Sequence, residues 1–196
     1  MSRLNALGIG IILSISMVAC SSHPDTLTTP TTVSSAQEAV SASAARSMSA
    51  THGERLTAVL GTGSGIVNVT PTAAVDGSFS AEITVEVRNA APNTRFYIQR
   101  APEIGRSNSA DGVCQRAAGE APWGPPAPNF VTFPLPAPGP LVTLQTSTGG
   151  AGTTHIDFRA PTIADGTMFD VMFRVVDDLT TPTTDLRTSC FTVIVK

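Results

Sequence analysis

The chain has 196 residues, of which only 14% are charged, and its formal net charge is −3 at pH 7. This small negative charge gives no electrostatic reason to expect binding to nucleic acid or to an anionic membrane surface. Fifteen prolines and 16 glycines, with many serines and threonines, favour turns and extended chain over helix.

The first 20 residues carry a secretion signal. Arg3 supplies a positive start, residues 6–15 are mostly apolar, and Ala19 is a small residue directly before Cys20. A charged start, an apolar run and a small-residue exit are typical of a secretory signal peptide. The apolar run is too short to cross a bilayer, so we predict a signal peptide over 1–19.

The end of this signal, Met17-Val18-Ala19-Cys20, resembles the lipobox of bacterial lipoproteins, with Met17 where leucine is usual. The resemblance implies that Cys20 is acylated, for example with palmitate, and anchors the protein to the membrane of the cell envelope. Each buried methylene of such an anchor contributes about 0.8 kcal/mol. Ser21 after the cysteine implies sorting to the outer membrane if the cell is Gram-negative. A cleaved signal with an incidental cysteine, or an uncleaved anchor, are the alternatives.

Residues 20–53 are nearly all small or polar and include no aromatic residue. Such a composition buries too little apolar surface to offset the entropy of ordering. We therefore predict a disordered, Ser/Thr/Pro-rich tether that spans on the order of 30 Å between the lipid anchor and a folded domain over 54–196.

Within that domain, apolar and polar residues alternate with a period of two, which is typical of half-buried β-strands. The clearest stretch, 79–88, places five apolar side chains on one face: Phe79, Ala81, Ile83, Val85 and Val87. Further strands are predicted at 56–60, 65–70, 94–100, 130–133, 141–146, 155–160, 169–175 and 189–195.

About eight or nine short strands, each with one apolar face, must bury those faces against one another. The predicted fold class is all-β: a two-layer antiparallel β-sandwich, broadly immunoglobulin-like. The likeness concerns architecture only, because no tryptophan lies in a strand between the cysteines.

Cys114 and Cys190 remain as a pair once Cys20 is acylated. In an exported protein such a pair predicts a disulfide, which in the chain-entropy model is worth about 4 kcal/mol for so long a loop. A metal-binding or catalytic thiol is the alternative, although neither cysteine lies in a CxxC motif or beside a histidine.

Residues 101–129 contain five prolines and Trp123, the only tryptophan. A loop of this length is usually functional or disordered, and the predicted bridge at Cys114 favours order. Two interpretations of Trp123 stay open. It folds back over one open end of the sandwich, or it contacts a partner, with Tyr97 as a second aromatic contact.

No catalytic or metal-binding motif is evident in the sequence. Three histidines, His23, His52 and His155, are too few and too scattered for a zinc or copper site, so we predict no metal and no cofactor. The glycine-rich residues 61–65, GTGSG, lack the GxSxG order of a hydrolase nucleophile. Carboxylates between 177 and 185 match no EF-hand spacing, which favours a solvated loop over a calcium site.

The sequence therefore predicts a non-enzymatic envelope lipoprotein, either a binding module for an envelope protein or glycan, or a structural component. A glycan site normally uses two or three coplanar aromatic rings, and the chain offers only Tyr97 and Trp123. The rival is an envelope enzyme, or an accessory subunit of an enzyme or transport complex. Its candidate residues, which also fit ordinary surface charges, are Arg100, Arg106, Asp111 and Arg116.

Overall fold

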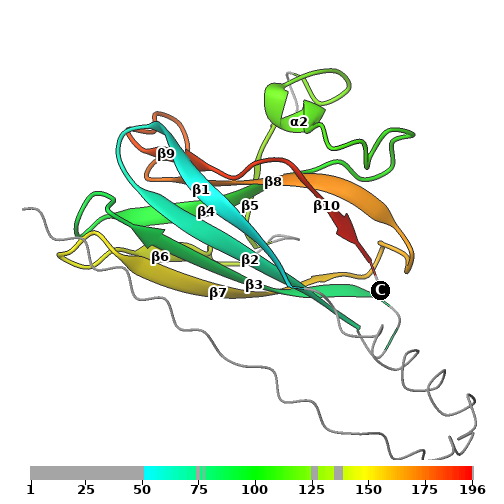
Figure 1. The fold of residues 1–196 in the computed structure, drawn as a ribbon, viewed down its shortest axis with the longest axis horizontal. Helices are drawn as coiled ribbons and strands as arrows, with labels where there is room; N and C mark the ends of the chain where they lie inside the picture. Colours follow the sequence, from blue (N-terminus) through cyan, green and yellow to red (C-terminus); the bar gives the residue numbers. More distant parts are fainter. Residues whose placement is uncertain (1–50, 74–75, 77, 125–127, 135–138, 196) are drawn as a thin grey trace, which may run out of the picture. The chain divides into compact units, whose positions relative to one another are not determined.

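The computed structural model describes residues 51–73, 76, 78–124, 128–134 and 139–195 (Figure 1). The predicted signal peptide, the lipidation site at Cys20 and nearly all of the tether lie outside the described residues. Among the described residues, no helix has the length and hydropathy of a membrane span.

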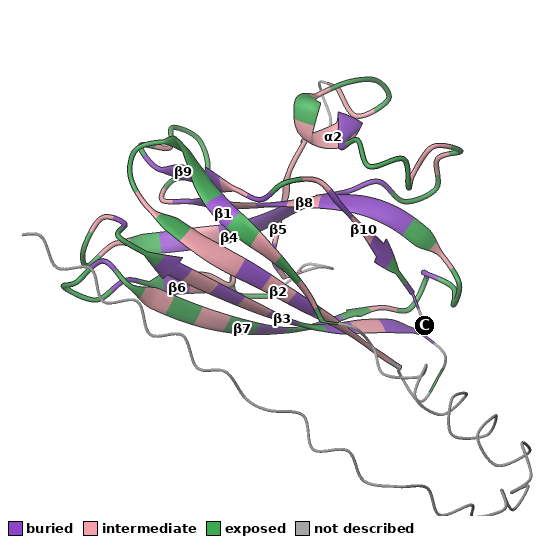
Figure 2. Cartoon of the chain, in the orientation of Figure 1, coloured by how far each residue is buried: buried purple, intermediate pink, exposed green. Residues whose placement is uncertain are grey.

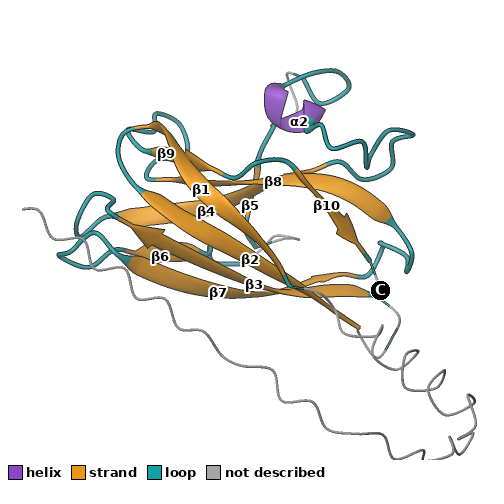
Figure 3. Cartoon of the chain, in the orientation of Figure 1, coloured by secondary structure: helices purple, strands orange, loops and turns teal. Residues whose placement is uncertain are grey.

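The described residues form ten strands and one short helix (Figure 3). The strands are β1 (His52–Leu60), β2 (Ser64–Ala73), β3 (Phe79–Arg88), β4 (Arg95–Pro102), β5 (Val131–Thr132), β6 (Thr143–Gln145), β7 (Gly152–Ala160), β8 (Met168–Val176), β9 (Asp185–Arg187) and β10 (Phe191–Ile194). The helix is α2 (Gln115–Ala118), a single turn between β4 and β5.

All the strand pairs are antiparallel and belong to one sheet with the order β5-β4-β8-β9-β1-β2-β3-β7. β10 continues β9 along one side of β8, and β6 accompanies β5 along one side of β4. The sheet curls strongly into a half-barrel, so that β1, β2, β3 and β7 form one arm and β5, β4, β8 and β9 form the other (Figure 1). The predicted all-β, antiparallel class is confirmed.

The core fills the space between the two arms (Figure 2). The alternation over 79–88 predicted its buried face correctly, because all five apolar side chains of β3 are buried. The strand predicted at 169–175 is likewise present in β8, where Phe169, Val171, Phe173 and Val175 are buried. From the other strands come fully buried side chains including Leu56, Val67, Phe96, Ile98 and Leu144.

The two ends of the strand order, β5 and β7, leave a seam along the half-barrel. The seam is closed at one end by the turn between β6 and β7, where the Ala90 backbone N–H donates to the Gly150 carbonyl at 3.1 Å. Gly150 has φ +70°, and a Cβ there would lie 2.2 Å from the Ala90 carbonyl oxygen. Only glycine permits this approach without strain.

The predicted disulfide is present. Cys114 and Cys190 are bonded, with their Cα atoms 5.6 Å apart, within the range that disulfides ordinarily span. Cys190 lies between β9 and β10, so the bridge fastens the segment after β4 to the strand pair on the far side of β8. We call residues 103–130, which join β4 to β5, the long loop.

Candidate functional site: a cleft under the long loop

The long loop lies against the outer face of the β4–β8 arm. Its helix, α2, is seen above β8 in Figure 1. Asp170 of β8 fastens it there. This carboxylate is fully buried, and it accepts hydrogen bonds from the Gly112 backbone N–H at 2.7 Å and from the Thr192 hydroxyl at 2.6 Å. A buried polar group is stable only when it is hydrogen-bonded, so the loop and Asp170 stabilise each other.

Glu103 performs a similar task at the start of the loop. Its side chain is fully buried, and its Oε1 accepts a hydrogen bond from the Arg116 backbone N–H in α2 at 2.7 Å. Burial raises the pKa of Glu103 above its ordinary value, although the bond from Arg116 works in the opposite direction. The two buried acids thus hold both the start and the middle of the long loop.

Trp123 packs inside the long loop. Its ring lies 4.6 Å from the guanidinium carbon of Arg106 and 5.7 Å from that of Arg116. Arg116 also donates to the carbonyl oxygens of Pro102 and Asn129 at 3.3 and 3.1 Å. These contacts give Trp123 a role in ordering the loop, while its side chain stays half-buried.

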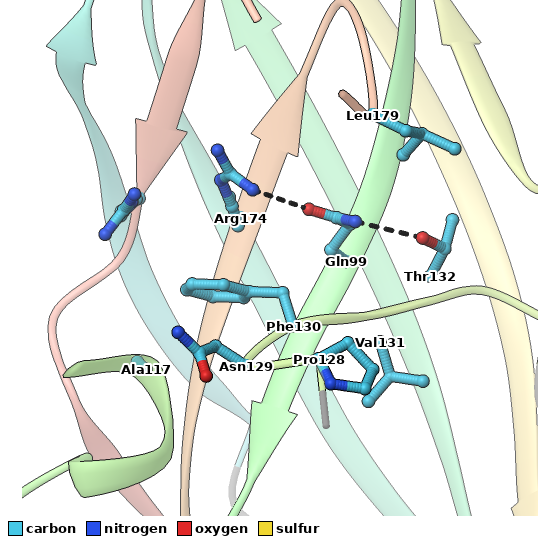
Figure 4. A pocket seen from close by; sticks show the side chains of 10 residues that line it. Gln99, Ala117, Pro128, Asn129, Phe130, Val131, Thr132, Arg174 and Leu179 are labelled. Carbon is cyan, nitrogen blue, oxygen red and sulfur yellow. Dashed lines mark hydrogen bonds between the residues drawn. The ribbon is translucent and has the colours of Figure 1, made fainter. Parts of the chain in front are cut away.

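Between the end of the loop and the arm lies an open cleft of about 540 Å³ (Figure 4). Strands β4, β8 and β9 form its floor, and the stretch around β5 forms one wall. The residues that give it its character are Gln99, Phe130, Thr132, Arg174, Leu179 and Arg187.

Two arginines and one carboxylate set the charge of the cleft. Asp185 of β9 is nearly buried, with 5% of its side chain exposed, and bonds both Arg174 and Arg187 at 2.8 Å. Burial alone would raise the pKa of Asp185. Hydrogen bonds and attraction from the two arginines outweigh burial and hold that pKa below its ordinary value. One positive charge is left in excess.

Phe130 lies 5.3 Å from the guanidinium carbons of both Arg174 and Arg187, so its ring fixes their position. Gln99 accepts a hydrogen bond from Arg174 at 3.1 Å and donates one to the Thr132 hydroxyl at 3.0 Å, as the dashed lines in Figure 4 show. The result is a positively charged cleft with oriented hydrogen-bond donors beside an aromatic ring. Such a surface is suited to an anionic group on a partner.

The other residues considered in the sequence lie elsewhere. Tyr97 is half-buried on β4, opposite Thr143 and Val176, and neither it nor Trp123 lines the cleft. Asp111 accepts hydrogen bonds from Val113 and Gln115 inside the loop, and the Val113 bond lowers its pKa.

Arg106, Asp111 and Arg116 lie in the long loop, but Arg100 does not belong with them. Arg100 lies on the inner face of β4 and is buried, so its interpretation as an ordinary surface charge was wrong. Arg100 therefore lies on a strand, whereas the other three residues proposed for an enzyme lie in the long loop.

The two histidines in the described residues, His52 and His155, lie on different strands, β1 and β7. His155 is exposed on β7, between the Thr84 hydroxyl and the Asp157 carboxylate. His52 stacks on Phe191, and His23 lies outside the described residues. Among the described residues, no three His, Cys, Asp or Glu side chains are grouped as metal ligands would be.

The loop after β8 is held by its own carboxylates. Asp177 accepts hydrogen bonds from the backbone N–H groups of Thr183 and Thr184, both at 2.9 Å. Asp178 accepts others from Thr180 and Thr181, at 2.7 and 2.8 Å. Asp185 belongs to β9 and bonds arginines, so these three carboxylates serve separate partners.

Sequence reasoning missed the cleft. The alternation in 169–175 indicates that Arg174 faces away from the core, and Gln99 occupies a similar position in 94–100. No local pattern shows that these strands are neighbours or that Phe130 returns to cover them.

Comparisons with models of protein families, with curated proteins and with solved structures found no match.

Proposed function

We propose that this chain is a membrane-anchored envelope lipoprotein whose β domain is a non-enzymatic binding module for an envelope protein. The observation that supports it best is the cleft, in which Arg174 and Arg187 share the single carboxylate of Asp185. The lipobox-like sequence ending at Cys20 supports the anchor, and the polar composition of 20–53 supports a tether that holds the domain away from the membrane.

The way the long loop is held favours binding over a purely structural role. Its order depends on a disulfide at Cys114 and on two fully buried carboxylates, Glu103 and Asp170. A shorter connection between β4 and β5 would serve the sheet equally well, and loops of this length are usually functional. The long loop ends at Phe130, which completes the wall of the cleft.

An acidic protein segment is the partner that this chemistry fits. Arginine and aromatic side chains are the groups that contribute most to protein–protein binding. The excess guanidinium charge matches a carboxylate, because the planar fork of arginine binds carboxylates through two parallel hydrogen bonds. A glycan fits less well, since Phe130 is the only aromatic residue among the described residues that line the cleft.

In this proposal the two arms of the half-barrel act as the facing layers of an immunoglobulin-like sandwich. The cleft then lies on the outer surface of one layer, and the acylated Cys20 fixes the module to the outer membrane of a Gram-negative envelope. The layers supply rigidity, while the long loop supplies the binding surface.

The proposal is tested by crosslinking the full-length protein in its native envelope and identifying what it captures. Arg187→Gln and Phe130→Ala each alter the cleft, while Arg88→Gln alters an exposed arginine on β3, in the other arm. We expect one dominant protein partner, lost in both cleft variants and retained in Arg88→Gln. Capture that is unchanged by both cleft variants, or no specific capture, would contradict the proposal.

A further inference from the structure

A second cavity lies at the seam of the half-barrel. It has a volume of about 410 Å³ and is formed by the end of β4, the end of β7 and the loop that follows β7. Its walls are mainly apolar, from Ile104, Phe158, Ala160, Pro161 and Ile163, and Arg100 lies at its inner end. This seam cavity shares no residue with the cleft lined by Arg174 and Arg187.

Arg100 is a buried cation without an anion. It lies on the same face of β4 as the core residues Phe96 and Ile98, and only 8% of its surface is exposed. Its guanidinium carbon lies 4.1 Å from the ring centre of Phe158 and 5.1 Å from that of Phe133.

The Nε atom of Arg100 is buried and has no hydrogen-bond partner. None of the ion pairs among the described residues includes Arg100. Burial, with some repulsion from Arg116, lowers the pKa of Arg100 to about 10, so the guanidinium still carries its charge at neutral pH.

Two phenylalanine rings offset only part of the cost of burying this charge, because they accept no conventional hydrogen bond. Guanidinium has five N–H donors in a planar fork that matches a carboxylate. Behind Arg100, toward the core, the free space is about 20 Å³, enough for one water molecule but not for an organic ligand. A ligand must therefore reach Arg100 through the seam cavity.

We propose that the seam cavity binds an amphipathic monocarboxylate, such as a medium-chain fatty acid. The carboxylate pairs with Arg100 at the inner end, and the apolar chain lies against Ile104 and Ile163 nearer the surface. The volume lies within the range of small-molecule sites, which are mostly apolar with a few polar groups that fix orientation. Arg159 stands exposed at the rim. This inference is independent of the function proposed for the cleft.

The test is a calorimetric titration of the exported full-length protein with decanoate and with decanol, its neutral counterpart. The protein carries Cys20→Ser, so that its own acyl chains do not compete. We expect saturable binding of decanoate and at least about tenfold weaker binding of decanol, the difference that a charge-assisted hydrogen bond makes. Equal binding of the two, or no saturable binding of decanoate at millimolar concentration, would overturn the proposal.

Variants locate the site. Arg100→Gln and Ile104→Glu should each weaken decanoate binding at least about tenfold. Ile104 is 38% exposed, so its replacement leaves the core intact. Leu60→Glu, which also replaces an exposed aliphatic residue by glutamate but on β1, is the control and should bind like the parent. Unchanged binding in Ile104→Glu would overturn the proposal.

A second readout covers the case in which Arg100→Gln does not fold. The Nε–H signal of Arg100 in the NMR spectrum of the parent protein should shift on adding decanoate and stay in place on adding decanol. An unshifted Arg100 signal at saturating decanoate would place the ligand elsewhere and overturn the proposal.

Discussion

Asp185 is the residue on which the cleft depends, and its replacement by asparagine gives a quantitative test. The substitution Asp185→Asn keeps the shape of the side chain but removes its charge. Arg174 and Arg187 then lie beside each other without the carboxylate that both of them bond at 2.8 Å. The cleft gains positive charge while the fold loses a buried ion pair.

The magnitude follows from burial. Removing one partner of a buried ion pair typically costs about 3–5 kcal/mol. Arg187 keeps 31% of its side chain exposed, and water therefore stabilises part of its unpaired charge. We accordingly expect a loss of about 3 kcal/mol in the free energy of unfolding, a large share of the 5–15 kcal/mol typical of a domain.

Urea unfolding of the full-length protein measures this loss, and Asp157→Asn is the matched control. The Asp157 side chain is 83% exposed and pairs only with His155 in the described structure, so its replacement should change stability by less than about 0.5 kcal/mol. A loss below about 1 kcal/mol for Asp185→Asn would contradict this role of Asp185, because it would mean that the arginines do not need the carboxylate.

The pH dependence of the free energy of unfolding tests the same role of Asp185. Folding lowers the pKa of Asp185 below its ordinary 3.8, so its stabilising contribution is complete above that value and is lost as the pH falls through the lower folded value. The stability difference between the parent and Asp185→Asn should therefore shrink as the pH falls below 3.8. A difference that stays the same at neutral and acidic pH would contradict the assigned role.

Three further outcomes follow from the described contacts and the sequence. Phe96→Ala, at a fully buried site, should cost about 3–5 kcal/mol in urea unfolding, whereas exposed Val59→Ala should be nearly neutral. Asp170→Ala should speed amide hydrogen exchange at Gly112 in the long loop while β8 stays protected, since it removes the carboxylate that holds this amide. Cys20→Ser should abolish incorporation of labelled palmitate into the protein, and continued incorporation would contradict lipidation at Cys20.

The strands were predictable where the local pattern was long and unbroken. Both bounds of β3 agree with the prediction for 79–88, because ten residues alternate without a fault. β9 was missed because it has three residues, two of them charged, and its Asp185 is stabilised by arginines rather than by apolar burial. Three residues are too few to show the period-two alternation by which a strand is predicted.

The cleft and the seam cavity could not be predicted from the sequence, for a different reason. Alternation places Asp170 on the outer face of β8, which predicts exposure, yet the long loop covers it completely. The course of that loop depends on buried carboxylates and a disulfide, not on a local pattern. The burial of Arg100 could have been predicted, because in the predicted strand 94–100 it lies on the same face as Phe96 and Ile98.

The most direct test of the central claim, that the cleft is where a protein partner binds, is a photocrosslinking residue placed in the full-length protein in its native envelope. Leu179 lines the cleft and is exposed, and Val59, exposed on β1 in the other arm, is the matched position. We predict one dominant protein adduct from position 179 that is absent from position 59. The same adducts from both positions, or none from 179, would contradict it.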